Sequence, residues 1–64
     1  MIEVGDEVIF KSQYTDYKAK VFGIAKDTNV WNEKYAITYI GYDGTRMNRV
    51  VREDQLQEKN LEEH

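Results

Sequence analysis

Large apolar residues take every second position in two stretches of this chain, residues 17–22 and 34–40. A period of two places such residues on one face of a β-strand, whereas an amphipathic helix needs a period near 3.6. The alternating positions are Tyr17, Ala19, Val21, Tyr35, Ile37 and Tyr39. Lys18 and Lys20 fall between them and are expected to face water. The pattern predicts an all-β body in which each strand buries one face.

Turn residues divide the chain into short strands. The expected strands are 8–10, 17–22, 34–40 and 47–51. The turns between them are expected at 4–7, 12–16, 27–29 and 41–45, the last around Asp43-Gly44, a dipeptide favoured where positive φ is required. Residues 53–56 are polar helix formers and predict a short helical turn that brings Leu56 against the body. Four or five strands that curl on themselves predict a small SH3-like barrel, which removes exposed edges.

The chain is too short for two domains, because its 64 residues bury only about 60% of the unfolded surface. It has no cysteine, and its single histidine is His64, so the core must hold without a disulfide or a structural zinc. We expect one domain over residues 1–57 and an acidic tail over 58–64. Residues 61–64 resemble the start of a vector-encoded affinity tag.

The residues needed for most catalytic chemistry are missing. A nucleophile with its base, a metal site or a cofactor cradle requires histidine, cysteine or phosphate-loop glycines, and the four glycines do not have that spacing. We therefore expect a non-catalytic protein with no cofactor and no metal. No apolar run approaches the roughly 20 residues that cross a bilayer, and no signal peptide is visible, which predicts an intracellular, soluble module without membrane contact.

Tyrosines are the most informative residues for function. Tyr17 and Tyr39 are equidistant from the expected turn at 27–29, so they are predicted to be cross-strand neighbours, and Tyr42 in the next turn is close enough to join them. Tyr42 is expected to face solvent. Trp31 lies near the tip of the hairpin, too far away to join this cluster. The alternative is that Tyr17 and Tyr39 only cap the core with their hydroxyls in water.

Three segments carry a resemblance to a known family. Residues 4–8 (VGDEV), 17–21 (YKAKV) and 35–42 (YAITYIGY) resemble the chromo barrel domains, also called Tudor-knot domains, over about positions 4–56. Such domains occur in chromatin proteins of the mortality-factor-related and male-specific-lethal types. Some bind methylated lysine on histone tails through an aromatic cage, and others bind RNA or DNA. The resemblance implies an SH3-like barrel that acts in the nucleus as part of a larger chromatin-modifying complex.

The resemblance also implies a binding site. The cage aromatics of the family fall on Tyr17, Tyr39 and Tyr42. The next wall of the family cage is usually Trp. That position falls on Arg46 if the sequences are aligned without a gap, and on Met47 if the turn here is one residue longer. The longer turn also aligns Val51 and Leu56 with apolar positions of the family. A family histidine is replaced by Thr38. Tyr14, in the preceding turn, is a candidate lid over this partial cage.

Two other functions remain open at this point. The first is RNA or DNA binding through basic residues, although the net charge of −3 gives it little support. The residues expected to contact phosphate are Lys11, Lys18, Lys20, Arg46, Arg49 and Arg52. Those on the fourth strand would divide between its two faces. The second is a protein–protein scaffold that has lost its ligand. The expected partner is a histone tail peptide with methylated lysine, and the isolated domain is expected to be a monomer.

Overall fold

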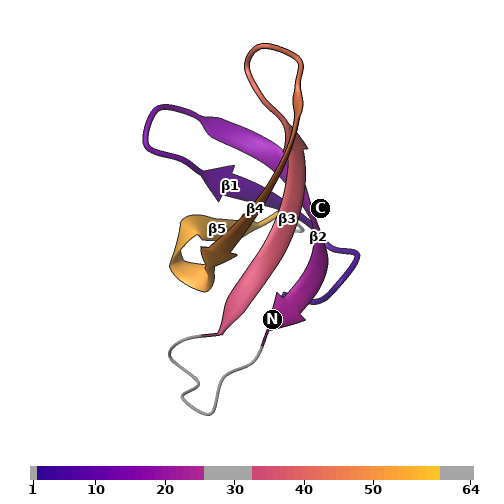
Figure 1. Cartoon of the computed structure of the whole chain (residues 1–64). Helices are drawn as coiled ribbons and strands as arrows, with labels where there is room; N and C mark the ends of the chain where they lie inside the picture. Colours follow the sequence, from indigo (N-terminus) through magenta and orange to yellow (C-terminus); the bar gives the residue numbers. More distant parts are fainter. Residues whose placement is uncertain (1, 26–32, 60–64) are drawn as a thin grey trace.

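Five antiparallel strands form one sheet in the computed structural model, which describes residues 2–25 and 33–59. The strands are β1 (Glu7–Lys11), β2 (Asp16–Ala25), β3 (Lys34–Ile40), β4 (Arg46–Arg52) and β5 (Leu56–Glu58). Their order in the sheet is β4-β3-β2-β1-β5 (Figure 1). The described residues contain no α-helix, only a single 3-10 turn, η2 (Glu53–Gln55). The prediction of an all-β fold is confirmed, and no described helix could cross a membrane.

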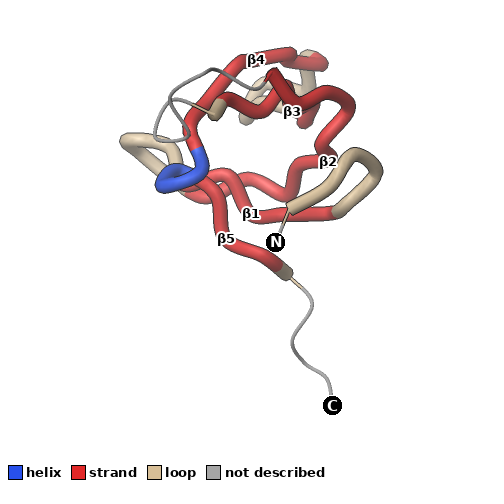
Figure 2. The backbone as a smooth tube through the Cα atoms, turned by 90° about the horizontal axis from the view of Figure 1, so that it is seen from below, coloured by secondary structure: helices blue, strands red, loops and turns tan. Residues whose placement is uncertain are grey.

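The sheet curls around a common interior (Figure 2). Alternate residues of the strands point into it, and the core consists of Ile2, Val8, Phe10, Ala19, Val21, Tyr35, Ile37, Tyr39 and Val51. Tyr17, Ile24 and Leu56 pack against this core and are partly buried. The expected inward positions of β2 and β3 are confirmed, while Lys18 and Lys20 are exposed as predicted.

The pairing of β2 with β3 differs from the expected register. Tyr39 pairs with Ala19, two residues further along β2 than the predicted partner Tyr17. The pairing also shifts between Val21 and Gly23, where Phe22 is an extra residue on β2. Such a bulge changes the offset between two strands and cannot be read from the position of a turn. The expected turn at 27–29 and Trp31 lie outside the described residues.

The C-terminal segment adds a strand that the sequence did not define. Residues 53–55 form the expected helical turn, in which the Arg52 backbone amide donates to the Gln55 side chain at 3.2 Å. Leu56 then begins β5 and pairs with Phe10 of β1. Leu56 is partly buried against the core, as predicted, but it lies in a strand rather than in the helical turn. β5 ends at Glu58, one residue beyond the expected end of the domain.

Candidate functional site

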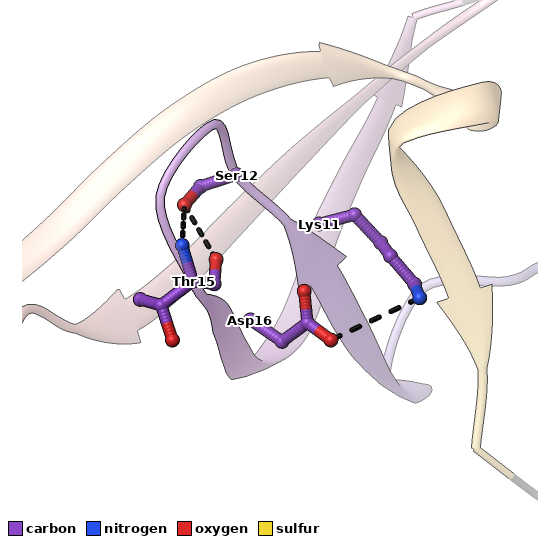
Figure 3. A network of polar contacts seen from close by, with 4 residues as sticks. All are labelled: Lys11, Ser12, Thr15 and Asp16. Carbon is purple, nitrogen blue, oxygen red and sulfur yellow. Dashed lines mark hydrogen bonds and ion pairs between the residues drawn. The ribbon is translucent and has the colours of Figure 1, made fainter.

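The turns joining β1 to β2 and β3 to β4 lie at the same end of the sheet (Figure 1). The β1–β2 turn is fixed by Ser12, whose hydroxyl donates to the Thr15 carbonyl and accepts from the Thr15 amide at 3.1 Å (Figure 3). Lys11 and Asp16 form an ion pair at 3.8 Å across the base of the turn. These contacts hold Tyr14 at the tip, where its side chain is 88% exposed.

The β3–β4 turn carries two further residues of the site, Tyr42 and Asp43. It is closed by hydrogen bonds from the Gly41 amide to the Thr45 carbonyl at 2.7 Å and from the Gly44 amide to the Gly41 carbonyl at 2.9 Å. Gly44 adopts a φ of +86°, which favours glycine. Tyr42 is 92% exposed, in agreement with the prediction that it faces solvent.

Asp43 accepts a hydrogen bond from the Thr45 backbone amide at 3.0 Å. This hydrogen bond lowers the pKa of the Asp43 carboxyl below its ordinary value, because the amide stabilises the ionised form. The turn therefore carries a negative charge beside the Tyr42 ring at neutral pH.

Three aromatic rings pack together where the turns meet the core. The ring centroids of Tyr17 and Tyr39 are 4.8 Å apart, and those of Phe10 and Tyr39 are 5.2 Å apart. Phe10 and Tyr17 complete the triangle at 6.4 Å. Tyr39 is only 6% exposed and belongs to the core, while Tyr17 is partly buried. The two tyrosines thus help to close the core, as the alternative interpretation held, and also reach its outer rim.

A pocket of about 430 Å³ opens over these rings. Its lining comes from β1, β2, β3, β4, η2 and the two turns. The lining residues are Phe10, Ser12, Gln13, Tyr14, Tyr17, Tyr39, Gly41, Tyr42, Asp43, Met47, Arg49 and Gln55. All five residues predicted to form the methyl-lysine site are among them, so segments far apart in the sequence bring them to one place.

Met47, not Arg46, takes the fourth position around the pocket. Met47 pairs with Tyr39 across β3 and β4, and directly paired residues share a face of the sheet. Arg46 lies on the other face, where its guanidinium donates to the Thr38 hydroxyl at 3.1 Å. Gly41 lies close behind Met47, because a Cβ at Gly41 would be 3.3 Å from Met47 Cγ. A side chain at position 41 would therefore require Met47 to shift slightly.

The packing of Tyr17 against Tyr39 limits how a ligand can bind. Ring centroids 4.8 Å apart leave no room for a cation between the two rings. The pair therefore forms one continuous wall. A cationic group would have to sit over this wall and be enclosed from the other sides by Tyr42, Tyr14 and Met47.

Arg49 also lines the pocket, which separates it from the other candidate phosphate-contacting residues. It pairs with Ile37 and so faces the inner side of the sheet, and its guanidinium carbon is 5.5 Å from the centre of the Phe10 ring. A guanidinium over an aromatic face is a favourable cation–π contact. Its positive charge disfavours a second cation placed beside it.

Apart from Arg49, the basic residues of β2 and β4 share the outer face. Lys18 and Lys20 alternate with buried Ala19 and Val21, and Arg46 and Arg52 alternate with Met47 and Val51. Lys18, Lys20 and Arg46 form no ion pair with any carboxylate of residues 2–25 and 33–59. Arg52 pairs with Asp54 at 3.6 Å, and Lys11 with Asp16. Four of the six residues of the nucleic-acid hypothesis thus share this face, but two of them, Arg46 and Arg52, lie at opposite ends of β4. Lys11 lies at the end of β1 and also faces outward.

Several pocket residues were not anticipated from the sequence. Asp43 was recognised only as part of a turn dipeptide, and Phe10 only as a core residue. Gln13 and Gln55 had no distinguishing feature. The alternation of β4 did indicate that its arginines would divide between faces, but the register needed to place Arg49 inside was not known.

Comparison with known proteins adds no further information: no protein-family model, curated protein or solved structure matches this chain. Within the described part of the chain, no group of three or more His, Cys, Asp or Glu side chains is arranged to hold a metal ion. The site is therefore interpreted from its own geometry.

Proposed function

We propose that this chain is a non-catalytic chromatin-binding module, an SH3-like barrel of the chromo barrel type, that binds methylated lysine on histone tails. One observation carries the proposal. A single pocket is lined by Tyr14, Tyr17, Tyr39, Tyr42 and Met47, which come from three strands and two turns. Methylated ammonium groups are bound in proteins by aromatic faces that surround the cation.

The chemistry of the lining supports a cationic ligand at the end of the pocket nearest the β3–β4 turn. The Tyr17–Tyr39 wall offers ring surface, and Met47 offers a polarisable apolar side chain beside it. Asp43 supplies a carboxylate at the rim. A methylated ammonium is less strongly hydrated than an unmethylated one, so it loses less on entering an aromatic pocket.

The expected affinity is low. A cation over a ring gains about 0.5 to 1 kcal/mol when the site is exposed and about 2 kcal/mol when it is desolvated. Tyr14 and Tyr42 are both highly exposed, so each contributes toward the lower figure. A dissociation constant toward the millimolar range is consistent with contributions of this size.

The decisive experiment is an NMR titration of the isotope-labelled chain with three versions of one histone-tail peptide. The versions carry trimethyl-lysine, unmodified lysine, and the uncharged isostere in which carbon replaces the trimethylated nitrogen. We expect shifts at Gly41, Tyr42 and Met47 with the trimethylated peptide alone. Equal shifts with all three, or none with any, would reject the proposal, and equal shifts with the first and third only would mean that burial rather than charge drives binding.

A second candidate function, binding of nucleic acid, is favoured by the outer face of the sheet. Lys18, Lys20 and Arg46 are exposed there without a carboxylate partner in the described residues. Binding of RNA or DNA through these side chains should weaken as salt concentration rises, because each phosphate contact releases a counterion. Lys20→Glu should reduce this binding and leave the pocket unchanged, which separates the two functions. Absence of both peptide and nucleic-acid binding would favour the protein–protein scaffold instead.

A further inference from the structure

Arg49 is the unexpected residue of the pocket, and its position follows from the strand register. On β4 it lies between Met47, which pairs with Tyr39, and Val51, which pairs with Tyr35. All three therefore face the inner side of the sheet. Val51 is buried and Met47 is 38% exposed, so the strand passes from core to rim with Arg49 in between. The backbone thus directs a guanidinium into the pocket.

The charge of Arg49 is not neutralised within residues 2–25 and 33–59. No carboxylate of the described residues forms an ion pair with Arg49. Its guanidinium makes a cation–π contact with the face of Phe10. The guanidinium group is charged and carries five N–H donors. Stacking on an aromatic ring uses the flat face of the guanidinium and leaves these N–H donors unused. The N–H groups of Arg49 are free to bind an anion that enters the pocket.

The two charged residues of the lining come from different parts of the β3–β4 hairpin. Asp43 belongs to the β3–β4 turn, while the backbone of Arg49 lies two residues beyond Met47 along β4, which is roughly 6.6 Å further from the turn. The lining around Asp43 favours a cation, and the lining around Arg49 favours an anion. A ligand that carries only a positive charge would match the first and be opposed by the second.

We propose that the pocket binds a peptide in which an Asp or Glu lies one or two residues from the methylated lysine, with its carboxylate bound by Arg49. This inference rests on the proposed function. An extended peptide advances roughly 3.3 Å per residue, so two residues span the backbone offset between Met47 and Arg49, and with one residue the side chains must cover the remaining half. The arginine that would repel an isolated methylammonium then selects among methylated sequences by their acidic neighbours.

The experiment uses trimethyl-lysine peptides of otherwise neutral sequence, with Glu placed at each position from two before to two after the lysine. Each Glu peptide is compared with a twin that carries Gln at the same position. For the best position we expect the Glu peptide to bind about twofold to fivefold more tightly than its twin, the upper part of the range expected for an exposed ion pair. Arg49→Gln should abolish that difference, and Arg46→Gln, on the outer face of the same strand, should preserve it.

The effect of Arg49→Gln on the affinity for the peptide without Glu provides an independent check. Arg49→Gln removes a repelling charge and should tighten binding of the peptides that lack Glu, while it weakens binding of the acidic one. Glu and Gln twins that bind equally at every position would overturn the inference even if methylated peptides bind. A preference for Glu that persists in Arg49→Gln would overturn it as well. If methylated and unmethylated peptides bind equally, the proposed function fails, and this inference fails with it.

Discussion

The ring centroids of Tyr17 and Tyr39 are 4.8 Å apart, although the two residues are not cross-strand partners. The partner of Tyr39 on β2 is Ala19. Tyr17 and Tyr39 are diagonal neighbours on one face of the β2–β3 pair, a spacing that aromatic side chains can bridge. Phe10 packs against both rings from β1. The wall of the candidate site is therefore also the end of the hydrophobic core, and substitutions in it affect binding and stability together.

Tyr39→Ala should destabilise the fold strongly. Removal of a buried aromatic side chain costs about 3 to 5 kcal/mol, a large part of the stability of a domain this small. Tyr39→Phe keeps the ring and should cost far less. Urea unfolding followed by circular dichroism would measure both. A Tyr39→Ala variant with an unchanged unfolding midpoint would show that the ring is not part of the core.

Tyr42→Ala should separate binding from stability. The side chain is 92% exposed, so its removal should change the free energy of unfolding by no more than about 0.5 kcal/mol. If it encloses the ligand cation, peptide affinity should fall about twofold to fivefold. Phe22→Ala is the matched control, because Phe22 is an exposed aromatic outside the pocket lining. Equal affinity for the Tyr42→Ala variant and the unaltered chain would remove Tyr42 from the site.

The sequence allowed the strands and their buried faces to be predicted because alternation depends only on local spacing. Tyr35, Ile37 and Tyr39 were assigned inward and are buried. The offset between β2 and β3 was not predictable, since it depends on the Phe22 bulge. β5 was only allowed for as a possible fifth strand, because a three-residue strand is too short to show a period.

The pocket was predicted less completely than the fold. Tyr17 and Tyr39 were predicted as neighbours from an assumed register that was wrong by two residues, and they still meet because diagonal neighbours on one face are within reach of aromatic side chains. The charges could not be placed in the same way. Whether Arg49 faces the pocket depends on a one-residue choice of register on β4, since a shift by one residue reverses every side chain. Asp43 reaches the pocket through the geometry of its turn, which the Asp-Gly pair alone does not specify.

Met47→Trp should strengthen binding of a methylated peptide. Met47 is 38% exposed on an edge strand, so a larger side chain can extend over the pocket without entering the core. An added aromatic face is worth about 0.5 to 2 kcal/mol toward a cation, or roughly twofold to thirtyfold in affinity. Met47→Leu keeps an apolar wall and is the control for shape. Isothermal calorimetry would compare the three proteins, and no gain with Trp would mean that the cation does not sit next to position 47.

Tyr35 predicts how stability depends on alkaline pH. Burial raises the pKa of the Tyr35 hydroxyl above its ordinary value near 10, and the negative charges of Glu53 and Glu33 raise it further. The folded protein therefore holds this proton more tightly than the unfolded chain does. The contribution to stability is complete below the unfolded pKa and is lost as pH rises above about 10, toward and through the folded pKa.

Urea unfolding midpoints measured between about pH 8 and 11 would test this dependence. Tyr35→Phe should show a smaller loss of stability with rising pH than the unaltered chain, because it has no hydroxyl to ionise at this buried position. Tyr14→Phe removes an exposed phenol instead and is the matched control, with the steeper loss retained. An identical alkaline slope in the Tyr35→Phe variant and the unaltered chain would mean that the buried hydroxyl does not couple folding to pH.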